Sequence, residues 1–156
     1  MKKIVWISSY PKSGNTFLRA MLSAFFYSKD GTFKQDYLKN ISEFPRDFFD
    51  FKPKNNFLNE VKEYEKVQKK ISGTDKDVIF LKTHSANLII NETFPTINKD
   101  FTVCSIYIVR DPRNVILSLK NHYNLDIKKS LNLLTNEKNF ISMNNKDLSK
   151  GYTLTL

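Results

Sequence analysis

The sequence has 156 residues, of which 40% are hydrophobic, and its formal net charge is +9. This length suffices for a domain with a buried core, and the apolar content excludes a disordered chain. A single cysteine, Cys104, and two histidines exclude an internal disulfide and a zinc cluster of Cys and His ligands. The basic charge favours anionic partners without choosing among nucleic acid, phosphorylated ligands and acidic lipids.

The N-terminus carries basic residues that precede a short apolar run. This run, residues 4–7, spans only four positions, which is too short for the apolar region of a signal peptide. No stretch of the sequence approaches the length of a membrane-spanning helix. We therefore predict a cytoplasmic protein without a membrane span.

The first part of the chain predicts one strand, one helix and an irregular segment. Residues 2–9 are β-branched, aromatic and mostly apolar, which predicts a buried strand. Apolar residues at helical spacing predict an amphipathic helix over 15–28. Turn signals and prolines interrupt residues 29–56, whose phenylalanines either fill the core or line a substrate cleft. These are Phe33, Phe44, Phe48, Phe49 and Phe51.

The middle of the chain predicts a charged helix over residues 57–71, followed by a second short strand over 77–84. Residues 86–94 are predicted to form a short helix that Pro95 ends. The inward side of the charged helix is predicted to carry Leu58, Val61, Tyr64 and Gln68.

The last part of the chain contains the most apolar strand candidate, residues 101–110, which we predict to be central in its sheet. Pro112 then opens a helix that continues to about residue 123, since proline suits the first turn of a helix. Residues 126–140 add another helical stretch. The chain ends on a β-like segment, residues 152–156.

This alternation of apolar strands and helices predicts the α/β class, with a parallel sheet flanked by helices in a single domain over residues 1–156. Three polar clusters fall at the carboxyl ends of predicted strands, at residues 10–16, 82–85 and 110–114. Ligands bind such sheets outside the carboxyl ends of the strands. We therefore expect the three clusters to meet at one site.

The first cluster has the composition of an anion-binding loop. Gly14 lets the backbone approach a ligand, Lys12 adds a mobile cation, and Ser13 and Thr16 offer hydroxyl donors. A helix N-terminus adds unpaired N–H groups and a positive dipole end, which suit phosphate or sulfate. The stretch does not match the G-x-x-x-x-G-K-[ST] phosphate loop. The alternative is a simple turn in which Asn15 or Thr16 caps the helix.

Two stretches, YPKSGNTF (10–17) and VRDPRNVILSLKNHY (109–123), closely resemble the two donor-binding signatures of cytosolic-type sulfotransferases. That family usually has Tyr-Pro-Lys-Ser-Gly-Thr-Thr-Trp and Arg-(Asn/Asp)-Pro-(Lys/Arg)-Asp-x-x-x-Ser. The resemblance implies a fold like that of P-loop nucleoside-triphosphate hydrolases. It also implies transfer of a sulfuryl group from 3′-phosphoadenosine 5′-phosphosulfate (PAPS) to a hydroxyl or amine, without a metal. The expected acceptor is small or glycan-like, and no nucleic-acid partner is expected.

The resemblance also implies roles for individual residues. The loop from Lys12 to Thr16 would hold the 5′-phosphosulfate, Phe17 would stack on the adenine, and the second signature would grip the 3′-phosphate. His84, in the segment LKTHSA, would be the general base, assisted by Lys82. The catalytic candidates are thus His84, Lys12 and Lys82, and the donor-binding candidates are Lys12, Ser13, Gly14, Asn15, Thr16, Phe17, Arg110 and Ser118. We predict a structural role for His122.

The sequence departs from the family pattern in three places. Asn15 replaces a threonine, Phe17 replaces a tryptophan, and Ser85-Ala86 replaces an apolar-proline pair. The family also continues to an Arg-Lys-Gly segment that this sequence lacks, so we expect a C-terminally shortened, incomplete domain. The alternatives are a non-catalytic nucleotide-binding remnant, an ATP-dependent P-loop kinase and a basic nucleic-acid binder.

Overall fold

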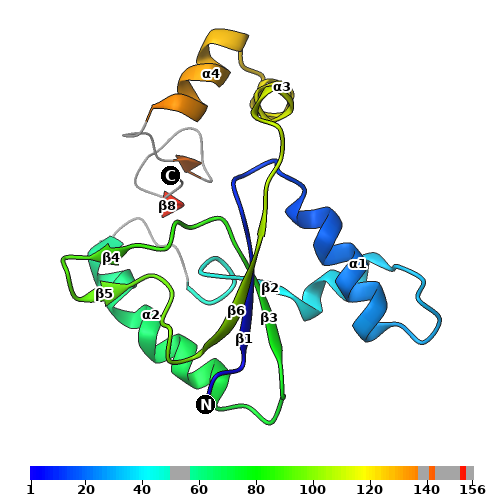
Figure 1. The fold of residues 1–156 in the computed structure, drawn as a ribbon, viewed down its shortest axis with the longest axis vertical. Helices are drawn as coiled ribbons and strands as arrows, with labels where there is room; N and C mark the ends of the chain where they lie inside the picture. The colour runs from blue at the N-terminus through cyan, green and yellow to red at the C-terminus, as the bar shows by residue number, and fades with distance from the viewer. Residues whose placement is uncertain (50–56, 137–140, 143–151, 154–156) are drawn as a thin grey trace.

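Four parallel strands form the central sheet of the computed structural model, which describes residues 1–49, 57–136, 141–142 and 152–153. These strands are β1 (Ile4–Ser9), β2 (Ser42–Glu43), β3 (Ile79–Thr83) and β6 (Thr102–Ile108). Their order is β2-β3-β1-β6, and β1 pairs in parallel with β3 on one side and β6 on the other (Figure 1). The predicted parallel α/β fold is confirmed.

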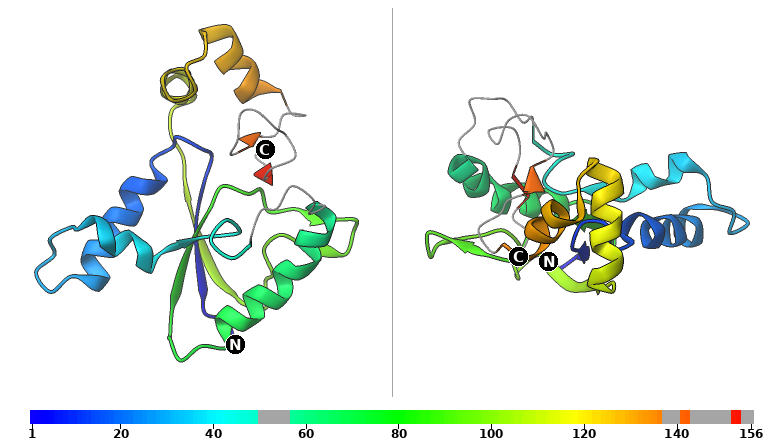
Figure 2. Two further views of the ribbon diagram at one scale, coloured as in Figure 1. Left: turned by 180° about the vertical axis from the view of Figure 1, so that it is seen from behind. Right: turned by 90° about the horizontal axis from the view of Figure 1, so that it is seen from above.

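Two helices lie on opposite sides of the sheet, and two more lie beyond the carboxyl ends of its strands (Figures 1 and 2). Helix α2 packs against the face of β1 that carries Ile4 and Trp6, and α1 lies on the other side. The helices are α1 (Asn15–Tyr27), α2 (Phe57–Ser72), α3 (Pro112–Tyr123) and α4 (Ile127–Thr135). Each matches a predicted helix, although the last positions of the fourth prediction, 137–140, lie outside the described residues.

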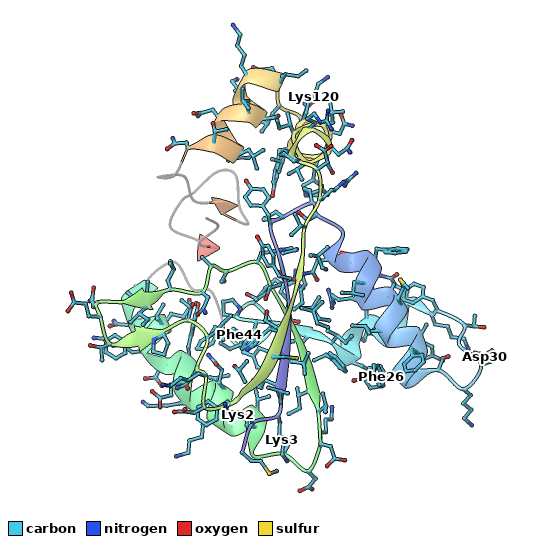
Figure 3. All side chains as sticks on the ribbon, in the orientation of Figure 1. Lys2, Lys3, Phe26, Asp30, Phe44 and Lys120 are labelled. Carbon is cyan, nitrogen blue, oxygen red and sulfur yellow. The ribbon has the colours of Figure 1, made fainter. Side chains whose placement is uncertain are left out.

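The core between the sheet and α2 is rich in aromatic side chains. Phe44, labelled in Figure 3, contacts Trp6 with 5.4 Å between ring centroids and Tyr64 with 4.9 Å. Phe48 and Phe49 pack against the same cluster. These three phenylalanines of the 29–56 segment therefore fill core. Phe33 is 41% exposed, and Phe51 lies outside the described residues.

The side of α2 that faces the core carries the residues that the sequence predicts there. Val61, Tyr64 and Gln68 are all buried. Gln68 is satisfied in the core because its Nε2 donates to the carbonyl of Thr96 at 3.1 Å. The side chain of Leu58 lies outside the described part of the structure.

The prediction of a short helix over residues 86–94 is wrong. This segment forms an antiparallel hairpin of β4 (Ile89–Ile90) and β5 (Phe94–Pro95). Asn91 and Glu92, between the two strands, have φ angles of 49° and 58°. Such left-handed conformations belong to a turn and cannot continue a right-handed helix. The hydroxyl of Thr96 bonds the backbone of the same segment, which stabilises its non-helical course.

The prediction that residues 101–110 form the central strand is also wrong. Among the described strands, β1 is internal and β6 lies at the end of the sheet. Val103 and Tyr107 of β6 are 53% and 63% exposed, whereas Trp6 of β1 is fully buried. A continuous apolar run is common to both strands, so it does not distinguish the strand that has two neighbours.

The remaining described elements are small. They are η1, a 3-10 helix (Gln35–Asn40), and an antiparallel pair formed by β7 (Ile141–Ser142) and β8 (Tyr152–Thr153). The β-like end of the sequence is thus confirmed at residues 152–153. None of the described helices has the length and apolar character that crossing a membrane requires.

Candidate functional site

The loop between β1 and α1 has an unusual backbone. Lys12 and Gly14 have φ angles of 69° and 105°. Gly14 is the N-cap of α1, and no side chain caps this helix end. The first N–H groups of α1 therefore lack intrahelical acceptors, and the helix dipole adds positive partial charge. Together these features provide donors for an anion such as phosphate or sulfate.

A cavity of about 570 Å³ opens at the carboxyl ends of the strands, and the three predicted polar clusters meet in it. We call it the basic cavity. The cavity is lined by residues from the loop after β1, from the end of β3 and from the segment after β6. The predicted site residues that line it are Lys12, Gly14, Asn15, Thr16, Lys82, His84, Arg110 and Ser118.

Two predicted donor-binding residues are not part of this lining. The backbone N–H of Ser13 donates to the carbonyl of Tyr10 at 3.2 Å, and the serine is buried. Phe17 projects from α1 and is 72% exposed. The predicted roles of both residues stay predictions.

His84 is oriented by the end of β1. Its Nδ1 lies 2.8 Å from the carbonyl oxygen of Ser9, an atom that can only accept a hydrogen bond. Nδ1 therefore carries the proton, and Nε2 of the neutral ring has a free lone pair. Burial, and next the charge of Lys82, lower the pKa of His84 below its usual value. The imidazole is thus held in the neutral form that a general base requires.

Asn15 anchors the strand end that orients His84. It is buried, and its Nδ2 donates to the carbonyl of Ile7 at 3.0 Å and to Oγ of Ser9 at 3.2 Å. Because the carbonyl of Ile7 only accepts, the amide orientation is determined by this contact. Asn15 thus links α1 to the last residues of β1 and, through Ser9, to the imidazole of His84.

Lys82 is paired with a carboxylate inside the site. Its Nζ lies 2.7 Å from Oε2 of Glu43, and both side chains are buried. Arg46 approaches the same oxygen at 2.8 Å. Burial lowers the pKa of Lys82, and the carboxylate of Glu43 opposes this shift. The ion pair therefore keeps a desolvated ammonium charged beside the cavity.

Arg110 connects the loop after β6 to the loop after β1. Its Nη1 donates to the carbonyl of Lys12 at 2.9 Å. A guanidinium has five N–H donors, so this contact leaves others that can bind an anion. Ser118, on α3, lines the same cavity. The two residues of the second signature therefore both line the basic cavity.

Asp111, which an ATP-dependent kinase would use to hold magnesium, is engaged elsewhere. Its carboxylate caps α3 by accepting from the backbone N–H of Arg113 at 2.9 Å, and it pairs with the Arg113 side chain at 2.6 Å. Over the described ranges, no group of three His, Cys, Asp or Glu side chains could hold a metal ion.

The sequence did not reveal four residues of the cavity lining, which are Glu43, Arg46, His122 and Tyr123. His122, for which the sequence predicts a structural role, is exposed on α3, where its ring contacts Tyr123 with 4.7 Å between ring centroids. Its spacing of four residues from Ser118 was a usable signal, because such residues share a helix face. Glu43 gave no comparable signal, since it lies in a two-residue strand.

A comparison with protein families matches residues 2–152 to the model of the sulfotransferase domain. The chain belongs to the sulfotransferase family. Its parallel sheet flanked by helices is the P-loop-like α/β architecture of that domain. A comparison with curated proteins found no match. Family membership supports a sulfotransferase, a transferase enzyme, over the kinase alternative.

Proposed function

We propose that this sulfotransferase transfers a sulfuryl group from PAPS to a hydroxyl or amine of a small or glycan-like acceptor. The proposal rests on one observation: residues of both donor-signature segments and His84 line the same basic cavity. Among the described lining residues, Lys12, Arg46, Lys82 and Arg110 supply four cationic side chains there, against one carboxylate from Glu43. Such an excess suits a ligand that carries several phosphate and sulfate charges.

The residues around the basic cavity fit the donor. The N-terminus of α1 and Lys12 would hold the 5′-phosphosulfate, and Arg110 with Ser118 would hold the 3′-phosphate. When bound, the donor supplies the sulfuryl group. We propose adenine stacking by Phe17, whose exposed ring retains a free face.

The proposed chemistry assigns one task to each charged group. Nε2 of His84 accepts the proton that the acceptor loses as its oxygen or nitrogen forms a bond to sulfur. The bridging S–O bond breaks, and its electron pair stays on the phosphate oxygen. Lys12 and Lys82 stabilise the negative charge that grows on that oxygen. This arrangement requires no covalent enzyme intermediate.

Replacing Arg110 tests the donor site directly. We expect Arg110→Ala to weaken binding of 3′-phosphoadenosine 5′-phosphate roughly tenfold to a hundredfold, since a hydrogen bond to a charged group contributes about 1.5–3 kcal/mol. Arg113→Ala is the matched control, because Arg113 pairs with Asp111 and is absent from the cavity lining. Isothermal titration calorimetry would measure both affinities.

The same titration discriminates the alternatives. Tighter binding of ATP with magnesium than of 3′-phosphoadenosine 5′-phosphate would contradict the proposal. Equal losses in Arg110→Ala and Arg113→Ala would remove Arg110 from the phosphate site. Steep salt-dependent binding to duplex DNA would instead favour a nucleic-acid binder.

Gly14 offers a second test that separates stability from binding. A Cβ at Gly14 or at Gly31 would meet no atom within 4 Å, but both residues have positive φ angles, 105° and 77°. We therefore expect Gly14→Ala and Gly31→Ala each to lower the free energy of unfolding by about 1–2 kcal/mol. Only Gly14→Ala should also weaken nucleotide binding, because it alone reshapes the loop. Urea unfolding and calorimetry would measure the two effects, and similar nucleotide affinities in both variants would refute this role.

A further inference from the structure

His122 is a residue of the basic cavity that the proposed chemistry does not use. It belongs to α3 and lines the cavity together with Ser118 and Arg110. Because Ser118 and His122 are four residues apart on one helix, they share a face, with about 5–6 Å between their Cβ atoms. A hydroxyl and an imidazole at this separation can both reach the same phosphate group.

The imidazole of His122 is oriented by a neighbouring ring, and its nitrogens are available to a ligand. Its ring lies nearly perpendicular to that of Tyr123, with 4.7 Å between ring centroids and 83° between the ring planes. Such a contact between rings restrains their orientation. Within the described part of the chain, His122 forms no hydrogen bond or ion pair. A phosphate group is a suitable partner for such an imidazole, because it accepts hydrogen bonds and carries negative charge.

The basic cavity offers His122 no free carboxylate among its described lining residues. Glu43 is the one carboxylate there, and its Oε2 already lies 2.7 Å from Nζ of Lys82 and 2.8 Å from Nη1 of Arg46. The other charged side chains of the described lining are cations, namely Lys12, Arg46, Lys82 and Arg110. An imidazolium at position 122 therefore gains its counter-charge from an anionic ligand.

Other titratable groups near His122 are shifted away from neutral pH or engaged elsewhere. Burial lowers the pKa of His84. Burial raises the pKa of Tyr123, and it raises the pKa of Tyr10 to about 12, so both phenols are neutral at ordinary pH. Asp126 caps α4 by accepting from a backbone N–H at 2.7 Å. Histidine, in contrast, is the side-chain type that changes its charge between about pH 5 and 8.

We propose that His122 is a phosphate ligand of the donor site and binds the 3′-phosphate of the nucleotide together with Ser118 and Arg110. This inference rests on the proposed function for the identity of the ligand. When protonated, the imidazole adds a positive charge and a charge-assisted hydrogen bond, so binding of the nucleotide is coupled to the uptake of a proton. The coupling acts on nucleotide affinity and is separate from proton transfer by His84.

The variant His122→Gln isolates the charge, because a glutamine amide keeps a hydrogen-bond donor but cannot become a cation. Calorimetry would measure its affinity for 3′-phosphoadenosine 5′-phosphate on both sides of the range in which histidine titrates. We expect binding to weaken about tenfold at about pH 5.5 and less than about twofold at about pH 8. The ratio of wild-type to variant affinity at each pH removes the titration of the nucleotide's own phosphates, which is common to both proteins.

Adenosine 5′-phosphate and the variant Lys120→Gln are the matched controls. The first lacks the 3′-phosphate, so His122→Gln should bind it as tightly as the wild type does at both pH values. Lys120 lies on the same helix and is absent from the described cavity lining (Figure 3), so its loss should not change the pH dependence of binding. Equal losses for the two nucleotides in His122→Gln would place His122 away from the 3′-phosphate. A ratio of affinities that does not change with pH would overturn the coupling.

Binding of sulfate keeps this inference separate from the proposed function. The chain has two histidines, so His84→Asn leaves only the ring of His122 to observe by NMR. We expect sodium sulfate to raise the midpoint of the His122 titration above that in sodium chloride of equal ionic strength, because a nearby anion favours the imidazolium. A raised midpoint in a protein that binds no nucleotide would refute the donor proposal and leave His122 supported as an anion ligand. A midpoint that sulfate leaves unchanged would overturn the inference even where the nucleotide binds.

Discussion

Replacement of His84 by alanine is expected to lower kcat for sulfuryl transfer by about 10²–10⁴-fold, the usual contribution of a positioned general base. The reason is geometric. Nδ1 is engaged with the carbonyl of Ser9 at 2.8 Å, so Nε2 is the acceptor for the substrate proton. Alanine leaves that proton without an acceptor. The affinity for 3′-phosphoadenosine 5′-phosphate should stay essentially unchanged, and steady-state kinetics with calorimetry would measure both quantities.

Two further measurements distinguish a base from a structural histidine. His84→Asn places an amide donor near the carbonyl of Ser9 but has no group equivalent to Nε2, so it should be as inactive as His84→Ala. Added imidazole should restore part of the activity of His84→Ala, because it fills the vacated space with a base. Full kcat in His84→Asn, or a loss of nucleotide affinity equal to the loss of kcat, would contradict the assignment.

The pH profile of the wild-type protein follows from the same environment. Burial and the charge of Lys82 lower the pKa of His84 below the 6.5 that is usual for a histidine side chain. The catalytic form is the neutral one, which persists to lower pH when the pKa falls. The acidic limb of the kcat/KM profile should therefore have its midpoint below pH 6.5. A midpoint above that value would show that His84 is stabilised as a cation.

Much of the basic cavity was predictable because its residues lie at or just after the ends of apolar strands. Lys12, Lys82 and Arg110 each come within a few residues of a strand end, and parallel strands bring their carboxyl ends to one edge. The basic side chains at these positions then indicated that the ligand is an anion. Both pieces of information are local in sequence, which is why a single chain sufficed to place these side chains together.

The features that escaped prediction depend on contacts between distant segments. Glu43 lies 39 residues before Lys82 in sequence, in a strand of only two residues, and nothing local indicates that the two charges pair. The parallel pairing of β1 with β6 likewise joins segments that are far apart in the sequence. The prediction for the hairpin of residues 89–95 failed for a different reason. Isoleucines and polar residues at that spacing fit a short helix equally well.

Loss of the Glu43 carboxylate is expected to have the largest effect on stability. Glu43→Ala would leave the buried ammonium of Lys82 without the partner that now lies 2.7 Å away. Removing one member of a buried ion pair destabilises a protein by about 3–5 kcal/mol, because the other charge stays desolvated. Burial already lowers the pKa of Lys82, and loss of Glu43 should lower it further, so kcat should also fall as pH rises. Urea unfolding would measure the free-energy change.

A matched, exposed ion pair tests whether burial, and not distance, causes this effect. Asp36 and Lys39 also lie 2.7 Å apart, but their side chains are 84% and 80% exposed. Asp36→Ala should therefore change the free energy of unfolding by at most about 1 kcal/mol. The double variant Glu43→Ala/Lys82→Met removes the buried ammonium together with its partner, so it should recover much of the stability while transfer stays impaired. Equal losses in Glu43→Ala and Asp36→Ala would show that the interior pair is solvated, and Lys82 would then lack the desolvated environment that makes its charge effective beside the departing phosphate.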